Sequence, residues 1–323
     1  NTNKLTLKYN NKIEGEIPLD ALASKAPIYD RKWIKKKIIK NKVNFKKLKK
    51  IKIENALIKI LSSPNYSNKR WITSQYDQMV MCDTAQKSGS DAAIIRIHGK
   101  EKAIAVSVDS SSNYCKAHPL TGGKQIVCEN WRNLISVGAK PIAITNCLNF
   151  GNPEDPKIMG EFAECLIGIK ESCEFLDYPV VSGNVSFYNG TNKKNISPTP
   201  VIGGVGLIQK LANPIDCKFK KDNSNIFIVG KTLGHLGQSA FLEEIYSISD
   251  GQPPQVNLHN EKNNGESVLE IIKNNLANSV HDISSGGLLI ALAEMSMESN
   301  FGVKINKPKK LTNLFEYFFG EDQ

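Results

Sequence analysis

The pattern of hydrophobic and polar positions predicts alternating strands and helices through the middle of the chain. Short apolar runs bounded by turn residues indicate strands, and apolar residues at helical spacing indicate helices. The predicted strands are 92–97, 102–108, 141–145 and 198–206, and the predicted helices are 53–61, 122–138 and 158–175. Such alternation is typical of an α/β domain.

The stretch Pro179–Gly190 organises this region. Val180 and Val181 are β-branched and favour a buried strand, and Ser182–Asn184 predicts a loop at the end of that strand. In such a loop Gly183 would let the backbone approach a ligand, and Asn184 could offer a carbonyl oxygen to a hard cation. A polar turn between two strands is the alternative interpretation of the same residues.

A second region follows a break near residues 211–221. It is predicted to contain a strand at 226–229, a polar loop at 251–265, helices at 239–246 and 288–297, and a final apolar strand at 318–319. Small residues at Ser279–Gly287 precede the second of these helices. Helix starts of this kind bind anions, but a simple cap by Asp282 or Ser285 explains the pattern equally well.

The length of 323 residues suggests roughly two domains. The first residues resemble a strand already under way, and the last ones an apolar strand that leads into a polar turn. We therefore predict a piece of a longer polypeptide, with residues 1–65 as a linker and the tail of an upstream unit. A complete domain at 66–210 and an incomplete one at 211–323 are expected to follow.

Composition argues against a membrane-spanning protein, a secreted protein and a protein stabilised by disulfides or zinc. Hydrophobic residues make up 40% of the chain, yet no apolar run approaches the roughly 20 residues of a membrane span, and no secretory pattern begins the chain. Seven cysteines without a Cys-x-x-Cys pair argue against a disulfide framework and a structural zinc site. A cytoplasmic protein without a membrane partner is predicted.

The formal net charge of +10 is concentrated in one basic run, Arg31–Lys52, which contains no acidic residue. One interpretation is an arm that binds nucleic acid. The run lacks the interleaved aromatic and arginine residues that stack on bases, so a solvated linker is favoured and no nucleic-acid partner is predicted.

Several nucleotide-binding and catalytic motifs are missing from the sequence. It contains no P-loop, no Gly-x-Gly-x-x-Gly after a strand and no Gly-x-Ser-x-Gly elbow. Asp109, at the exit of a strand, is either a metal ligand or an ordinary turn residue. Polar loops at 109, 146 and 184 suggest Mg²⁺ held by oxygen atoms, with phosphates completing its shell.

Four segments carry a resemblance to a known family. They are Asn146–Pro153, Val181–Asn189, Pro198–Gly203 and His281–Leu288. In this order they resemble the synthetase subunit of the phosphoribosylformylglycinamidine synthase family, and the resemblance extends along the whole chain. It implies two fused copies of an aminoimidazole-ribonucleotide-synthetase-like unit, each an α/β domain followed by an α+β domain. This chain resembles the second copy, with its last domain truncated.

The resemblance also implies a function, which is ATP-dependent amidation of formylglycinamide ribonucleotide to formylglycinamidine ribonucleotide in purine biosynthesis. A glutaminase subunit would supply ammonia, a small accessory subunit would assist, and the missing amino-terminal half would complete the site. By position, Asn146 and Gly183 match ATP contacts, Asn184 a Mg²⁺ ligand and Ser186 a substrate contact. No catalytic residue is assigned, because the family's catalytic histidines lie in the first copy. The fragment alone is expected to be inactive, and the alternative is a structural half that holds a nucleotide without turnover.

Overall fold

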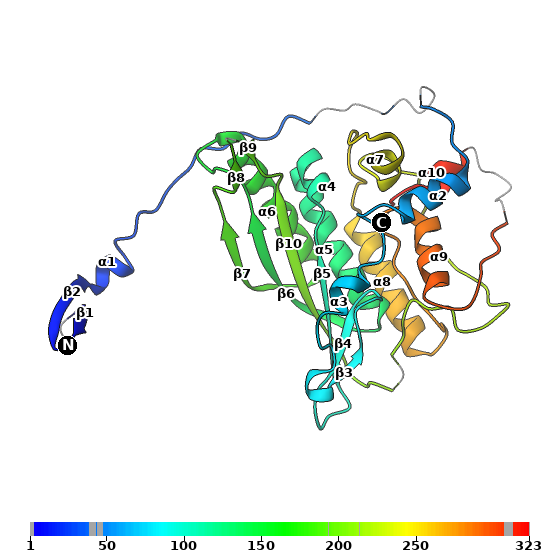
Figure 1. Ribbon diagram of the computed structural model, residues 1–323, viewed down its shortest axis with the longest axis horizontal. Helices are drawn as coiled ribbons and strands as arrows, with labels where there is room; N and C mark the ends of the chain where they lie inside the picture. The colour runs from blue at the N-terminus through cyan, green and yellow to red at the C-terminus, as the bar shows by residue number, and fades with distance from the viewer. Residues whose placement is uncertain are drawn as a thin grey trace. The chain divides into compact units, whose positions relative to one another are not determined.

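The computed structural model describes residues 3–38, 43, 48–192, 194–212, 214–306 and 313–322. The chain divides into two units, 1–32 and 33–323. The first unit is an antiparallel hairpin of β1 (Lys4–Tyr9) and β2 (Lys12–Pro18), followed by α1 (Leu19–Leu22) (Figure 1). The strand predicted at the start of the chain is therefore confirmed.

A six-stranded sheet forms the centre of the second unit, in the order β3-β4-β5-β10-β6-β7. Its strands are β3 (Thr84–Gln86), β4 (Ala93–Arg96), β5 (Ala103–Asp109), β6 (Lys140–Asn149), β7 (Val180–Ser186) and β10 (Thr199–Ile208). All neighbours are antiparallel except β6 and β7. A small hairpin, β8 (Gly190–Thr191) and β9 (Lys194–Asn195), follows β7.

Three helices, α4 (Ser112–Ala117), α5 (Pro119–Ser136) and α6 (Pro156–Leu176), lie on one side of this sheet (Figure 1). Alternate residues of β10 are buried, because side chains alternate between the two faces of a strand. Ile202 is fully buried in the core that the sheet shares with α5 and α6.

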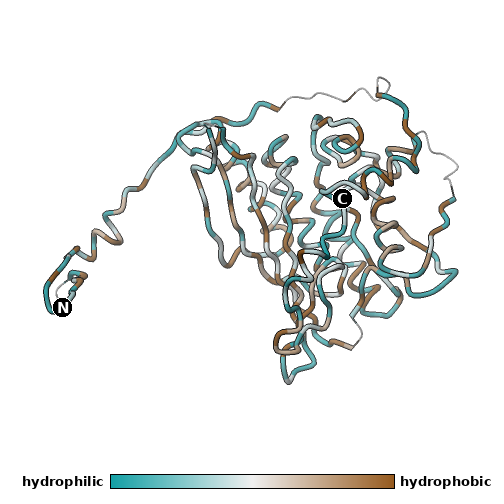
Figure 2. Tube along the Cα trace, in the orientation of Figure 1, coloured by the Kyte–Doolittle hydropathy of each residue, from teal (hydrophilic) through white to brown (hydrophobic). Residues whose placement is uncertain are grey.

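The other face of the sheet is apolar along β5 and β10, and it carries no covering helix in the part of the chain that the structure describes (Figure 1). Val205 pairs with Val106 in one row, and Gly203 pairs with Val108 in the next. Val108 is 68% exposed. Apolar positions recur along the strands of the sheet in Figure 2.

A second core is formed by α2 (Ile53–Leu61), α7 (Ala240–Tyr246), α9 (Gly287–Met297) and α10 (Leu314–Phe319). The other described helices are α3 (Arg70–Thr73), a 3-10 turn at Val80–Cys82, and α8 (Leu258–Lys273), which packs against the first core. Ile60 of α2 packs with Leu242, Ile290 and Phe319, so α2 joins residues from the far end of the chain. The mixed architecture agrees with the predicted combination of α/β and α+β folds.

The loop predicted at Ser182–Asn184 is wrong, because β7 continues to Ser186. The prediction of a buried strand is also wrong, since Val180 is 44% exposed and Val181 is 70% exposed. The strand lies at the edge of the sheet, where one of its sides has no neighbouring strand among the described residues.

Three further predictions in the second region fail. The segment 226–229 forms no strand ladder with any described residue, and Phe227 is 83% exposed. The predicted loop at 251–265 contains the start of α8, where the side chain of Asn257 accepts a hydrogen bond from the Asn260 amide at 3.0 Å. The predicted strand at 318–319 is the end of α10.

The basic run lies partly outside the described residues, at 39–42 and 44–47. None of the helices that the structure describes has both the length and the apolar character that a membrane crossing requires.

Candidate metal centre

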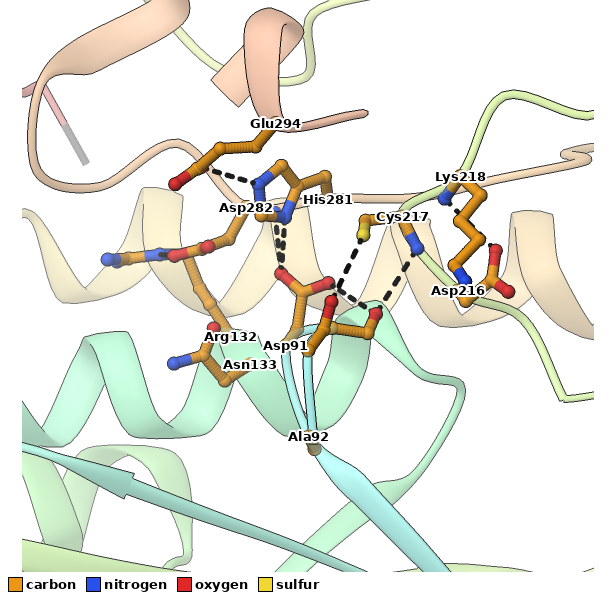
Figure 3. Close-up of polar contacts among 12 residues, drawn as sticks. Asp91, Ala92, Arg132, Asn133, Asp216, Cys217, Lys218, His281, Asp282 and Glu294 are labelled. Atoms are coloured by element: carbon orange, nitrogen blue, oxygen red, sulfur yellow. Dashed lines mark hydrogen bonds and ion pairs between the residues drawn. The ribbon is translucent and has the colours of Figure 1, made fainter. Parts of the chain in front are cut away.

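Asp91, His281 and Asp282 meet although they are far apart in the sequence. Asp91 precedes β4, and the other two residues precede α9. The two nitrogens of the His281 ring contact two carboxylates, with Nδ1 2.8 Å from Asp91 Oδ1 and Nε2 3.3 Å from Glu294 Oε2 (Figure 3). The Asp282 amide donates to the same Asp91 oxygen at 3.0 Å.

These three side chains could hold a divalent cation. Asp91, His281 and Asp282 each place one ligand atom within 4.8 Å of the others. Carboxylate oxygens and imidazole nitrogens are common ligands of divalent metal ions in proteins.

The charges at this cluster are an ion pair between Asp91 and His281 and a buried carboxyl group at Asp282. Burial opposes ionisation of Asp91 and His281, but their mutual attraction lowers the pKa of the Asp91 carboxyl and raises that of the His281 imidazole well above its usual value. Burial and the charge of Asp91 raise the pKa of Asp282 to about 7. Among the described residues, no hydrogen-bond donor reaches Asp282 Oδ2, and that atom is buried. The Arg132 guanidinium, 3.8 Å from this oxygen, compensates part of the charge, and a bound cation would compensate the rest.

Arg132 of α5 connects the cluster to α8. Its Nη1 atom donates to Glu261 Oε1 at 2.7 Å, and its Nε atom lies 3.8 Å from Asp282 Oδ2. The helices approach closely because α8 has a glycine at the contact: a Cβ atom at Gly265 would lie 2.1 Å from the ring of Trp131. Because Gly265 has no side chain, α8 can lie close enough to α5 for Glu261 to reach Arg132.

Asp109 is the last residue of β5 and is neither a turn residue nor an open metal ligand. Its carboxylate accepts hydrogen bonds from Ser107 Oγ at 2.8 Å, Asn130 Nδ2 at 2.6 Å and Asn133 Nδ2 at 2.8 Å. Burial raises its pKa. Burial and the charges of Asp109 and Asp282 likewise raise the pKa of Glu129 to about 8, so the surroundings of the cluster are rich in carboxyl groups.

The structure brings Asn146 and Gly183 together. They pair across β6 and β7, and a Cβ atom at Gly183 would lie 2.1 Å from Asn146 Oδ1. Asn146 also lines a hollow of about 570 Å³ beside α6, together with Lys170 and Glu174.

Asn184 and Ser186 project to the other face of the sheet. Asn184 pairs with Cys147, one position along the strands from the row of Asn146 and Gly183, and Ser186 pairs with Asn149 two positions further on. Because successive residues of a strand point to opposite faces, both lie on the face opposite to Asn146. The Ser186 hydroxyl bonds to Asn189 Oδ1 at 3.3 Å. The four residues therefore do not form one cluster.

The segment His281–Leu288 was one of the four that carry the family resemblance, but the sequence analysis assigned no role to His281. Neither Asp282 nor Ser285 caps α9: the Gly286 amide donates to Glu321 Oε1 at 2.6 Å instead. Asp91 carried no local signal, since it stands in a short polar segment before a strand. Its pairing with His281 spans 190 residues and depends on the tertiary fold.

Comparison with known families finds two adjacent domains. Residues 89–208 match "AIR synthase related protein, N-terminal domain", and residues 223–323 match "AIR synthase related protein, C-terminal domain". Asp91 lies in the first match, and His281 and Asp282 lie in the second.

The chain is similar to two curated proteins, each named phosphoribosylformylglycinamidine synthase subunit PurL. It is 53% identical to the protein of Pelagibacter ubique and 44% identical to that of Bradyrhizobium diazoefficiens, in both cases over 321 residues. These alignments cover 99% of this chain and 44% of each relative. The chain thus spans less than half the length of these relatives.

Solved structures give a consistent result. A structure of PurLQS from Thermotoga maritima matches 64% of this chain and 32% of that chain, with a TM-score of 0.50 and 32% identity. A HypE-HypF complex matches 71% of this chain and 69% of that chain, with a TM-score of 0.50 and 18% identity, which shows a shared fold alone.

Proposed function

Because the chain belongs to the AIR synthase related proteins and is similar to phosphoribosylformylglycinamidine synthase subunit PurL along its length, we propose that it is part of an ATP-dependent carbon–nitrogen ligase. The reaction converts formylglycinamide ribonucleotide to formylglycinamidine ribonucleotide in purine biosynthesis, in the cytoplasm. The cofactors are ATP and Mg²⁺, and a glutaminase subunit supplies ammonia with the help of a small accessory subunit.

The cluster of Asp91, His281 and Asp282 is the observation that supports this proposal best. Activation of an amide oxygen by phosphoryl transfer needs positioned groups and neutralisation of phosphate charge more than a protein nucleophile. Two carboxylates at the junction of two matched domains provide oxygen ligands for a cation there, and His281, which bonds to Asp91 and Glu294, orients Asp91. We propose that these carboxylates hold Mg²⁺, whose remaining ligands come from the nucleotide phosphates.

The contacts of Asn146 and Gly183 with ATP, of Asn184 with Mg²⁺ and of Ser186 with the substrate belong to the same proposal. The closeness of the Asn146 side chain to the Gly183 backbone and the hollow beside Asn146 support the first two contacts. The exposure of Asn184 on the strand leaves its amide accessible to a cation.

We propose that the rest of the longer protein covers the apolar sheet face that contains Val106, Val108 and Val205. The support is the exposure of Val108, together with the relatives' greater length. An uncovered apolar face of this kind marks an interaction surface.

Phosphate release tests the function. The chain is incubated with ATP, Mg²⁺, formylglycinamide ribonucleotide and ammonium chloride, alone and together with an amino-terminal half taken from a PurL relative. Ammonium chloride replaces the glutaminase, so the assay depends on the synthetase alone. We expect turnover only in the mixture. ATP that is bound and remains unchanged in the mixture would instead support the structural, nucleotide-holding half.

An Asn184→Leu variant tests the assigned metal ligand. We expect it to lose Mg²⁺-dependent ATP binding while it keeps its fold, because the side chain is exposed on an edge strand. Val181→Leu, at another exposed position of the same strand, is the matched control. Unchanged Mg²⁺-ATP affinity in the asparagine variant, measured by calorimetry, would refute this role.

A further inference from the structure

The segment that enters the second unit is bound along its backbone. The Ile34 amide donates to the Pro156 carbonyl at 2.9 Å, and the Lys36 amide donates to Glu164 Oε2 at 2.8 Å. Both acceptors belong to the first half of α6, and Glu164 is only 3% exposed. Alternate amides of one extended segment therefore face the same helix.

The side chain of Lys36 adds a second set of contacts. Its ammonium group lies 2.6 Å from Glu161 Oε1 and also donates to the Lys116 carbonyl at the end of α4. Both partners of the ion pair are largely buried, with side-chain exposures of 27% and 15%, which reduces screening by solvent. Lys36 thus joins α6 to the corner between α4 and α5.

Gly160 provides the space for this contact. A Cβ atom there would lie 2.0 Å from the Ile34 carbonyl oxygen, far inside any normal contact distance. Glycine inside a helix costs about 1 kcal/mol relative to alanine. At this position it leaves room for a second segment of backbone.

We infer that residues 34–36 are an anchoring strap, bound by α6 and by the end of α4, and that they are not part of a solvated linker. The surface of α6 around Gly160 is covered by this extended segment of the same chain. It is recognised through its main chain at Ile34 and through the ammonium group of Lys36. Within the strap the Lys36 ammonium group is paired with Glu161, so it is not a free cation of the basic run. Its bond to the Lys116 carbonyl connects the strap to the corner between α4 and α5.

Hydrogen exchange of the Gly160→Ala variant tests this inference on the whole chain. In the wild type we expect slow exchange at the Ile34 and Lys36 amides. In the variant we expect their exchange to accelerate at least about tenfold, because the new methyl group displaces the strap. The α6 amides should keep or increase their protection, since alanine favours a helix more than glycine does.

Gly302→Ala is the matched control, because no atom of the described residues lies within 4 Å of a Cβ at that position. It should leave both strap amides unchanged. Lys36→Ala is a second variant, which removes the ion pair with Glu161 and adds no volume, and it should accelerate exchange at Lys36 even if Gly160→Ala fails to fold. Rapid exchange of both amides in the wild type, or unchanged exchange in Gly160→Ala and Lys36→Ala, would overturn the inference.

Discussion

Replacing Asp282 by asparagine removes one negative charge from the proposed metal centre and keeps the size of the side chain. In the folded chain, burial and the neighbouring charge of Asp91 raise the pKa of Asp282 from 3.8 to about 7. A carboxyl group whose pKa is higher in the folded state than in the unfolded state leaves the fold at its full stability below the unfolded-state pKa. This stability is lost as the pH rises through the folded-state pKa. Without a cation, ionisation of Asp282 therefore weakens the fold.

The size of this effect follows from the two pKa values. At a pH above both, the ionised Asp282 destabilises the fold by about 4 kcal/mol relative to acid conditions. A cation present at 100 times its dissociation constant would return about 2.7 kcal/mol. For a chain of 323 residues, that gain corresponds to a rise of roughly 4 °C in the melting temperature.

Thermal unfolding at pH 8, followed by circular dichroism over a titration with Mg²⁺ or Mn²⁺, measures both effects. We expect the wild-type melting temperature to rise with the cation. Without a cation, Asp282→Asn should be more stable than the wild type, and it should show no rise when the cation is added. Asp222→Asn, at an exposed acid that bonds to Asn223, should respond like the wild type. A full cation-dependent rise in Asp282→Asn would refute the assignment.

Two further predictions concern the interior. Burial raises the pKa of Glu321 from 4.5 to about 7, so this residue makes the fold less stable as the pH rises between these values. Urea unfolding at pH 5 and pH 8 measures this loss of stability, and Glu321→Gln should reduce it by up to about 3 kcal/mol. An equal loss in the wild type and the variant would contradict this prediction. Gly204→Ala should destabilise the chain by about 1–3 kcal/mol in the same assay, because its Cβ atom would lie 1.8 Å from Asn130 Oδ1 and 2.1 Å from the Tyr178 hydroxyl. Gly203→Ala, on the other face of the strand, meets a Thr145 methyl group at 3.1 Å and no other atom of the described residues within 4 Å, so it should cost less. Equal losses would show that the Asn130–Tyr178 pair is not responsible.

Local periodicity was sufficient to predict much of the fold. The predicted helix at 53–61 coincides with α2, and those at 122–138 and 158–175 lie within a few residues of α5 and α6. These elements were predictable because each has a continuous apolar stripe and definite end signals, such as Gly138 with its positive φ of 77°.

Local sequence could not tell where a strand lies in its sheet. Val180 and Val181 have the composition of a central strand, but strand order places them at the edge. Segment 226–229 has strand-like residues, but a strand also needs a partner for its hydrogen bonds. Pairing is a property of the whole fold, which residue type and spacing do not encode locally.

Residue types and their spacing were enough to identify the apolar, periodic segments and the motifs that mark the family resemblance. The meeting of Asp91 with His281 and Asp282, and the orientation of Asn184 away from Asn146, could be seen only in the folded chain. A side chain's neighbours depend on strand register and helix packing between distant segments, whereas sequence preferences act over a few residues.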